Sequence, residues 1–249
     1  MQWNDDAIVL SLRAHGESAG ILEVLTRKHG RHLGVAHGCS SSRNRATLQP
    51  GNRLIVTWRA RIPEHLGVLT AELASARAPQ FFEERSALLG LNAAIAMAAA
   101  VLPEREPHEA AYDASDALLD SMAGHDLVAW GALYVFWELG LLNELGFGLD
   151  LARCAVSGTS NDLAYVSPRS GRAVSRDAGT DYRDRLLTLP LFLQRGHTPL
   201  ASLDDVLAGL RLTAHFLSRW VLEPCGKELP RARQRLADFA HREAGAAVQ

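Results

Sequence analysis

Cysteine and long apolar runs are both scarce in this sequence. Its 249 residues include three cysteines, Cys39, Cys154 and Cys225. An odd number of widely spaced thiols predicts no disulfide framework and favours a reducing compartment. The most apolar stretches, residues 88–102 and 127–142, are shorter than the ~20 residues that span a bilayer. Since the first six residues also lack the basic and apolar regions of a signal peptide, we expect a soluble, cytoplasmic protein.

The common catalytic and cofactor-binding motifs are also missing. There is no Walker-type loop and no Gly-x-Ser-x-Gly elbow, and Gly146-Phe147-Gly148 follows an expected helix rather than a strand. His108-Glu109 has no second histidine at the spacing that a zinc protease needs. We therefore expect neither an enzyme nor a bound cofactor.

Two groups of side chains could in principle bind metal. They are three aspartates, Asp113, Asp116 and Asp120, and three histidines, His29, His32 and His37. The aspartates recur at helical spacing among Ala and Leu, which favours a solvated helix face over a metal site. The histidines lie in a segment without carboxylates, so contact with nucleic acid or plain exposure is favoured over a metal cluster. The sequence predicts no metal site.

Negative charge is absent from one long segment. The whole chain has a net charge of −2, yet residues 24–63 contain neither Asp nor Glu. The same segment holds eight basic side chains, Arg27, Lys28, Arg31, Arg43, Arg45, Arg53, Arg59 and Arg61. An uncompensated positive field attracts polyanions, of which phosphate backbones are the usual ones. The alternative is a solvated face that only keeps the protein in solution.

The first 80 residues have the pattern of short strands separated by turns. The expected strands are residues 7–13, 21–26, 32–36, 53–61 and 65–74. Turn-forming residues such as His29-Gly30 and Gln49-Pro50-Gly51-Asn52 separate them, and residues 38–44 form a polar loop by composition. Five short strands favour a small closed or nearly closed barrel, either an OB-fold or an SH3-like barrel.

Helical patterns dominate after residue 80. The expected helices are residues 80–101, 107–122, 127–145, 203–222 and 230–242. Asp126 and Ser202 are the expected N-terminal caps of the helices over residues 127–145 and 203–222. The fold class is therefore α+β and multidomain. The expected domains are a barrel over residues 1–80, a helical bundle over 81–149 and 181–249, and an irregular insert over 150–180 rich in Gly, Ser and Asp.

Motifs in two zones of the chain occur in a characteristic order. The first zone has Thr26-Arg27-Lys28-His29-Gly30-Arg31 closing a hairpin, a basic loop over residues 35–45, and the turn Leu48-Gln49-Pro50-Gly51. The second zone is residues 150–156 followed by residues 163–175. Nearly the whole chain resembles the bacterial DNA repair protein RecO family of recombination mediators. The resemblance lies in the order and spacing of these motifs and in the layout of a barrel followed by helices.

The resemblance implies an architecture and a function that the residues alone do not give. It implies an N-terminal OB-fold, a helical bundle and a small zinc-finger-like insert. Proteins similar to this one bind single- and double-stranded DNA and anneal complementary strands coated with single-strand binding protein. They engage the C-terminal tail of that protein and, with RecR, promote RecA loading. The expected location is then cytoplasmic and nucleoid-associated, without membrane contact.

The insert departs from the family pattern at its cysteines. Several family members have two Cys-x-x-Cys pairs there, an arrangement that binds zinc through four thiolates. Here Cys154 has the first position and Ser157 the next, while Ser175 and Ala178 fall near the second pair. Because one thiolate cannot hold a structural zinc, we expect an insert that folds without metal. Cys154 is then expected to be a small buried hydrophobic residue.

The candidate DNA-binding residues are the eight cations of residues 24–63, which would neutralise phosphates. If the strand over residues 53–61 is regular, the period of two places Arg53, Arg59 and Arg61 on one face. Trp3 and Trp58 are the candidates for base stacking, although the alternation favours the barrel core for Trp58. A possible secondary basic patch consists of Arg231, Arg233 and Arg235 in the last helix. It would extend the DNA path or contact the acidic tail of single-strand binding protein, and a solvated helix face is the alternative.

Two rival functions stay open at this point. One is an OB-fold RNA-binding or translation-related module, which a preference for annealing DNA over binding RNA would exclude. The other is an enzyme with an unrecognised site, which a nuclease assay with a divalent metal would test.

Overall fold

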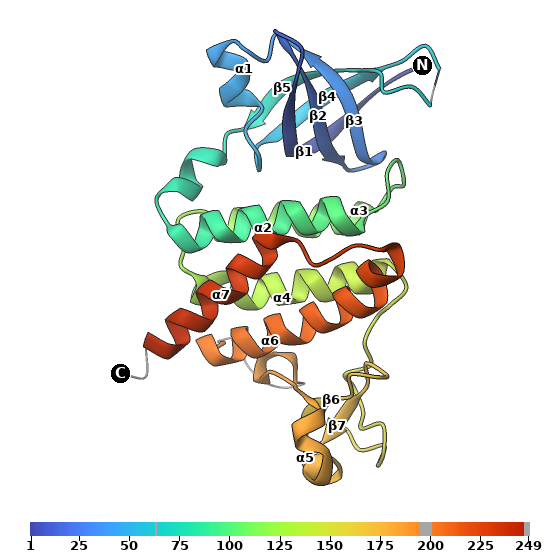
Figure 1. Cartoon of the computed structure of the whole chain (residues 1–249), viewed down its shortest axis with the longest axis vertical. Coiled ribbons are helices and arrows are strands. Elements are labelled where there is room, and N and C mark those ends of the chain that lie inside the picture. Colours follow the sequence, from blue (N-terminus) through green and yellow to red (C-terminus); the bar gives the residue numbers. More distant parts are fainter. Residues whose placement is uncertain (63, 195–200, 247–249) are drawn as a thin grey trace. The chain divides into compact units, whose positions relative to one another are not determined.

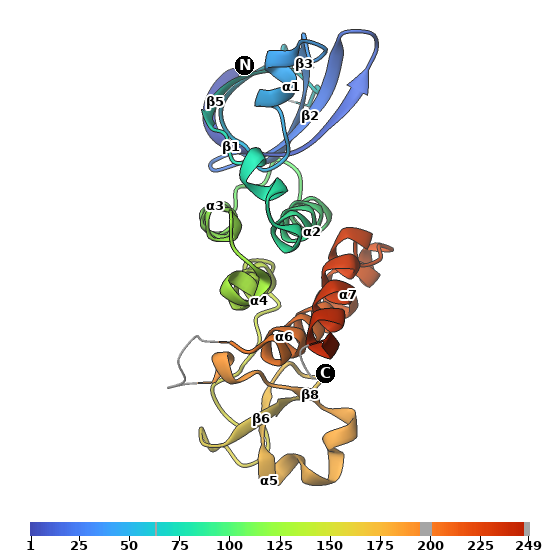
Figure 2. The same ribbon diagram turned by 90° about the vertical axis from the view of Figure 1, so that its left-hand side faces the viewer.

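The computed structural model describes residues 1–62, 64–194 and 201–246. The chain divides into two compact units, Met1–Gly124 and His125–Gln249, and we take each in turn. Figures 1 and 2 together label the helices and strands. Among the described residues, none of the helices combines the length and the apolar character that crossing a membrane requires.

The first unit begins with a closed five-stranded barrel. Its strands are β1 Gln2–His15, β2 Ala19–Thr26, β3 Gly30–His37, β4 Arg53–Arg59 and β5 Val68–Ser75. They follow the order β1-β2-β3-β5-β4 and close into a ring, which Figure 2 shows from near its end. The contact of β3 with β5 is parallel and joins Val35 to Val68, whereas the other neighbours are antiparallel. The predicted five strands are confirmed, and their arrangement is consistent with an OB-fold.

Alternation along β4 separates the barrel core from the surface. Leu54, Val56 and Trp58 are buried, whereas Ile55 and Arg59 are exposed. The Trp58 indole N–H donates to the carbonyl oxygen of Leu66 at 3.0 Å, so its polar atom is satisfied inside the fold. The predicted period of two is confirmed over this strand. The strand ends at Arg59, however, so Arg61 lies in the turn that follows and not on the strand.

A short helix forms where the sequence predicted a polar loop. This helix, α1, spans Ser42–Thr47 and contains Arg43 and Arg45. Ser41 caps its first turn, and the side-chain amide of Asn52 donates to two carbonyl oxygens of its last residues. Ser and Asn side chains bond the nearby backbone in turns, and here the same chemistry caps a helix. The expectation of a loop over residues 38–44 therefore holds for residues 38–41 and is wrong for residues 42–44.

Two helices complete the first unit. After a 3-10 turn at Ala78–Phe82, the chain forms α2 Arg85–Val101 and α3 Glu109–Met122. The aspartates of α3 are not a simply solvated helix face, because each of them has an arginine partner. Two of them, Asp116 and Asp120, bind the guanidinium of Arg77 at 2.8 and 2.7 Å. Arg77 follows β5 and is almost fully buried, so this contact fastens the barrel to α3.

The substitution Arg77→Ala tests the contribution of these ion pairs to stability. We expect Arg77→Ala to lower the free energy of unfolding of the first unit by about 2–3 kcal/mol, because two charge-assisted hydrogen bonds disappear from a buried place. Urea denaturation followed by circular dichroism measures the change. Arg13, an exposed residue of β1, supplies the control: Arg13→Ala is expected to stay within about 0.5 kcal/mol of the original chain. Equal midpoints for the two variants would contradict the structural role of Arg77.

The second unit is built on three helices, α4 Leu127–Glu144, α6 Leu203–Phe216 and α7 Arg231–Ala246. Helix α6 packs against both α4 and α7. Asp126 caps α4, and Ser202 with Asp205 forms a capping box on α6, so both predicted caps are confirmed. The α-helix that was expected over residues 203–222 ends at Phe216. The chain continues as a π-helical turn, Leu217–Leu222, and a 3-10 turn, Glu223–Cys225.

A small sheet lies between α4 and α6 in the chain. Its strands are β6 Leu163–Val166, β7 Ala173–Ser175 and β8 Leu187–Thr188, in the order β7-β6-β8. Short turns complete this region, α5 Arg176–Gly179, η2 Thr180–Arg185 and η3 Leu191–Leu193. Because β8 belongs to the sheet, this substructure extends beyond residue 180, where the sequence placed the end of the insert.

Cys154 is buried in this region, as predicted, but it is more than a hydrophobic residue. Its Sγ accepts the backbone N–H groups of Ser157 at 3.4 Å and Ser175 at 3.3 Å, and the Ser175 hydroxyl at 3.4 Å. Burial raises the pKa of the Cys154 thiol, but the donors outweigh burial and lower the pKa to about 6. The described residues contain no group of three or more His, Cys, Asp or Glu side chains that could hold a metal ion. An insert that folds without zinc stays a prediction.

Candidate nucleic-acid interface

Ion pairs divide the eight predicted cations into two groups. Three are paired: Arg27 with Asp113 at 3.0 Å, Arg31 with Glu23 at 2.7 Å, and Arg53 with Asp116 at 3.3 Å and Asp6 at 3.7 Å. Arg31 also donates to the Leu102 carbonyl oxygen at 3.0 Å. The segment without carboxylates along the sequence is thus partly neutralised in space by β1, β2 and α3. Arg27, Arg31 and Arg53 are poor candidates for phosphate contact, because carboxylates already bind their guanidinium groups.

The other five cations are exposed. They are Lys28, Arg43, Arg45, Arg59 and Arg61. Arg59 and Arg61 lie near the N-terminus, since Gln2 pairs with Arg59 across the barrel. In Figure 1, α1 with its two arginines lies on the other side of the barrel from the N-terminus. The structure therefore spreads the four arginines over the barrel surface instead of gathering them at one point.

An uncharged strip connects the two pairs of arginines. On the outward side of the sheet, Gln2 and Val68 flank Arg59, and Asn4 and Thr70 flank Thr57. From Thr70 the surface continues into a groove of about 180 Å³ between α1, β3 and β5, whose lining includes His37 and Asn44 and no carboxylate. We call Arg43, Arg45, Arg59, Arg61 and this strip the basic face.

Carboxylates flank the opposite end of β4. Asp6 on β1 and Glu72 on β5 flank Ile55, and Asp6 also reaches Arg53. A phosphate backbone that follows the sheet therefore meets repulsion at the Arg53 end and attraction at the Arg59 end. The sequence could not distinguish these two ends, because it placed Arg53 and Arg59 on one face of one strand.

Aromatic rings gather beside the turn between β2 and β3. Trp3 stacks on His29 with ring centroids 4.0 Å apart, and it lies 5.6 Å from Trp58. His32 meets both tryptophans edge-on at 5.0 Å. Burial, followed by the positive charge of Arg105, lowers the pKa of His32 to about 4. His32 is therefore neutral at pH 7.

This depressed pKa predicts a loss of stability in acid. The unfolded chain takes up a proton at its ordinary pKa of about 6.5, whereas folded His32 resists protonation until about pH 4. Between these values the unfolded state binds more protons, so acidification favours unfolding, by roughly 2 kcal/mol at pH 4.5 from this group.

The comparison of the original chain with His32→Leu isolates the contribution of His32. The original chain is expected to lose about 2 kcal/mol more than the variant when the pH falls from 7 to 4.5, as measured by urea denaturation at each pH. Parallel losses in both proteins would contradict the assignment of a buried neutral imidazole.

The three arginines of the predicted patch on the last helix do not share one surface. Arg231 and Arg235 of α7 are exposed, but Arg233 is fully buried. Residues two positions apart on a helix point in nearly opposite directions, so the three could not share one face. The assignment of Arg233 to a surface patch was therefore wrong.

Arg233 belongs to the core of the second unit. Its Nε donates to Glu138 Oε1 at 2.6 Å and its Nη2 donates to Glu138 Oε2 at 2.9 Å and to the Leu210 carbonyl oxygen at 2.8 Å. The hydroxyl of Thr213 also donates to Glu138. Glu138 and Arg233 are both 0% exposed, so this is a buried bidentate ion pair between α4 and α7.

The barrel and the helices define a class of protein: a small β-barrel with an uncompensated basic face, joined to a helical part. Two family models match the chain, "Recombination protein O N terminal" over residues 1–77 and "Recombination protein O C terminal" over residues 83–227. Three similar proteins are called DNA repair protein RecO, and each covers the chain almost completely. The protein of Rhodospirillum centenum is 51% identical, and the match covers 96% of this chain and 94% of that protein. The protein of Cereibacter sphaeroides (strain ATCC 17025) is 51% identical, with 97% of this chain and 99% of that protein covered. The protein of Caulobacter vibrioides (strain NA1000) is 48% identical, with 96% of this chain and 97% of that protein covered. The chain belongs to the RecO family.

Proposed function

We propose that this chain is a recombination mediator in DNA repair. It binds single- and double-stranded DNA through the basic face, anneals complementary strands coated with single-strand binding protein, and with RecR promotes RecA loading. The observation that carries the proposal is the basic face on the barrel, where Arg43, Arg45, Arg59 and Arg61 are exposed around a strip without carboxylates. The membership of the chain in a family of DNA repair proteins supports it.

The chemistry required is the neutralisation of phosphates. Arginines on the basic face displace condensed counterions, and this gain is independent of base sequence. Uncharged neighbours such as Thr57 and Thr70 can donate to phosphate oxygens but carry no sequence code. Two strands held with their charges screened and their bases free can pair with each other. Because no covalent bond is made or broken, the proposed function needs no catalytic residue and no cofactor.

Protein partners are also part of the proposal. The chain acts with RecR and RecA in the cytoplasm, and it engages the C-terminal tail of single-strand binding protein. Arg231 and Arg235 are exposed on α7 and separated by four positions, so they share one side of that helix. Two guanidinium groups on one side of a helix are suited to carboxylates of an acidic tail.

An annealing assay tests the proposed function. Complementary oligonucleotides coated with single-strand binding protein are mixed with and without the chain, and duplex formation is followed by fluorescence. We expect the chain to accelerate the annealing of coated DNA and to do less for RNA strands of the same sequence. Tight binding to RNA without any annealing of coated DNA would favour an RNA-binding module instead.

A further inference from the structure

A separate pocket lies at the mouth of the barrel beside the aromatic cluster. It has a volume of about 490 Å³, within the range of small-molecule sites. The lining residues that matter here are Trp3, Lys28, His29, His32, Trp58 and Arg105. Apart from Glu64, this lining contains no carboxylate among the described residues.

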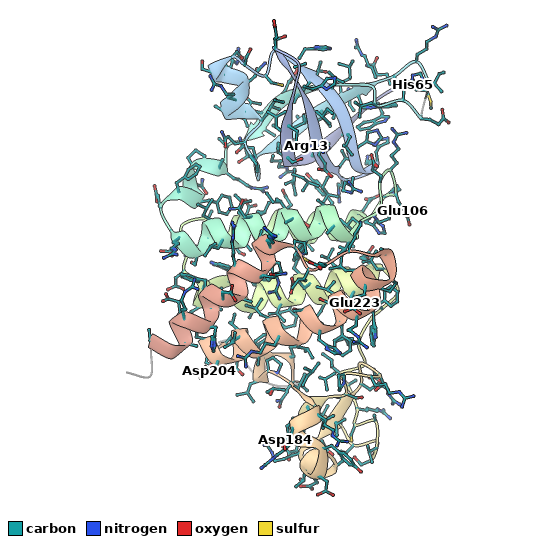
Figure 3. All side chains as sticks on the ribbon, viewed as in Figure 1. Arg13, His65, Glu106, Asp184, Asp204 and Glu223 are labelled. Carbon is teal, nitrogen blue, oxygen red and sulfur yellow. The ribbon has the colours of Figure 1, made fainter. Side chains whose placement is uncertain are left out.

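The walls of the pocket are rigidly held. Asp5 Oδ2 accepts the Lys28 backbone N–H at 2.7 Å and lies 2.8 Å from His29 Nδ1, which fixes the ring that stacks on Trp3. The opposite wall comes from the loop before α3, which carries Glu106 in Figure 3. In that loop Arg105 has a φ of 62°, and its backbone N–H donates to the Arg31 carbonyl oxygen at 2.8 Å. A non-glycine residue in the left-handed region costs energy, so the surrounding contacts must hold it there.

The backbone of the loop before α3 lies in close contact with the barrel. Gly30 has a φ of 69°, and a Cβ at this position would lie 2.0 Å from the Glu106 carbonyl oxygen. The Arg105 guanidinium also donates to the His65 carbonyl oxygen at 3.0 Å, which joins the loop to the β4–β5 connection. Both labelled residues, His65 and Glu106, lie on the same side of the barrel in Figure 3. The pocket is therefore preformed.

One polar side chain in the lining has no partner. His32 is 4% exposed, and neither Nδ1 nor Nε2 makes a hydrogen bond within the described residues. A neutral imidazole offers one donor and one acceptor, and leaving both unpaired in a buried place costs free energy. The lining thus combines flat aromatic surfaces, an unsatisfied donor and acceptor, and the cations Lys28 and Arg105.

We infer that this pocket binds one unstacked nucleobase of a single strand, an inference that rests on the proposed function. The base lies against the aromatic wall of Trp3 and His29, and its polar edge takes the donor and acceptor of His32. Lys28 and Arg105 bind the flanking phosphate. Aromatic rings accept any base face, so the pocket selects single strands over duplexes without selecting sequence. In a duplex the same base is already stacked and paired.

Three ligands of equal length and label separate base contacts from backbone contacts: oligo-dT, an abasic strand with the same phosphates, and a duplex. We expect the original chain to bind oligo-dT roughly 5- to 150-fold more tightly than the abasic strand, the ratio that the stacking of one base supplies. Trp3→Leu and His32→Leu should reduce this ratio toward one, with little change for the abasic strand and the duplex. The control Arg59→Ala should weaken the binding of all three ligands together.

The outcomes distinguish the inference from the proposed function. If the original chain binds all three ligands equally, or both leucine variants keep the full ratio, the pocket is not a base site although DNA binding stands. If the original chain binds none of them, the proposed function itself fails. Photocrosslinking of the original chain to a strand containing bromouracil needs no variant. Crosslinks at Trp3, His29 or Trp58 are expected, and crosslinks only elsewhere would overturn the inference.

Discussion

Arg233→Ala is expected to lower the free energy of unfolding of the second unit by about 3–5 kcal/mol. The change leaves the carboxylate of Glu138 at 0% exposure without its partner. It also removes the shorter of two side-chain hydrogen bonds to the Leu210 carbonyl oxygen, the other coming from the Thr213 hydroxyl. An uncompensated buried charge is among the largest single-site penalties in folded proteins. Urea or thermal denaturation followed by circular dichroism measures the loss.

Arg231 and Arg235 provide matched controls on the same helix. Both are exposed, and each alanine substitution is expected to change the stability by no more than about 0.5 kcal/mol. A second variant separates charge from packing: Glu138→Leu with Arg233→Met replaces the pair by apolar side chains and should recover much of the loss. If Arg233→Ala costs no more than Arg231→Ala, the buried ion pair does not stabilise this unit.

The combined variant Arg43/Arg45/Arg59/Arg61→Ala is expected to bind single-stranded DNA on the order of 10²–10³-fold more weakly at about 0.1 M salt. Each phosphate contact contributes about 0.7 to the slope of log K against log salt for single strands, so four lost contacts should flatten the slope by about 3. Fluorescence anisotropy of a labelled oligonucleotide over a range of salt concentrations measures both quantities. All four residues are exposed, so the fold should be kept.

A control with the same change in net charge is available in the second unit. Arg211, Arg231, Arg235 and Arg242 are exposed arginines of α6 and α7. Their joint replacement by alanine should weaken DNA binding far less than the loss of the basic face. If the two variants lose the same affinity, binding responds to net charge alone. If only the α6 and α7 variant loses affinity, the DNA path lies on the helices.

Local chemistry made part of this structure predictable. The alternation along β4 placed Trp58 inside and Arg59 outside, and Asp126 and Ser202 marked two helix starts through their side-chain oxygens. These signals work because a strand period and a cap depend on neighbouring residues only. Strand and helix patterns also predicted a barrel followed by helices, and the two matched family models divide the chain near residue 80 as well.

Partners distant in sequence decided the features that were missed. Arg27 pairs with Asp113, 86 residues further on, and Arg233 pairs with Glu138 at a separation of 95 residues. No periodicity links such positions, so a count of charges in one segment overstated the free cations. Arg233 itself carried a usable signal: its place two residues from both Arg231 and Arg235 on a helix should have put it on the opposite side.

The most direct test of this account is the rate at which complementary strands coated with single-strand binding protein anneal. The original chain should accelerate the reaction, and the Arg43/Arg45/Arg59/Arg61→Ala variant should lose most of that acceleration. The control Arg211/Arg242→Ala removes two exposed arginines of α6 and α7, leaves Arg231 and Arg235 in place, and should keep the acceleration. An unchanged rate with the first variant, at salt concentrations where the original chain is active, would contradict a DNA-annealing role for the basic face of the barrel.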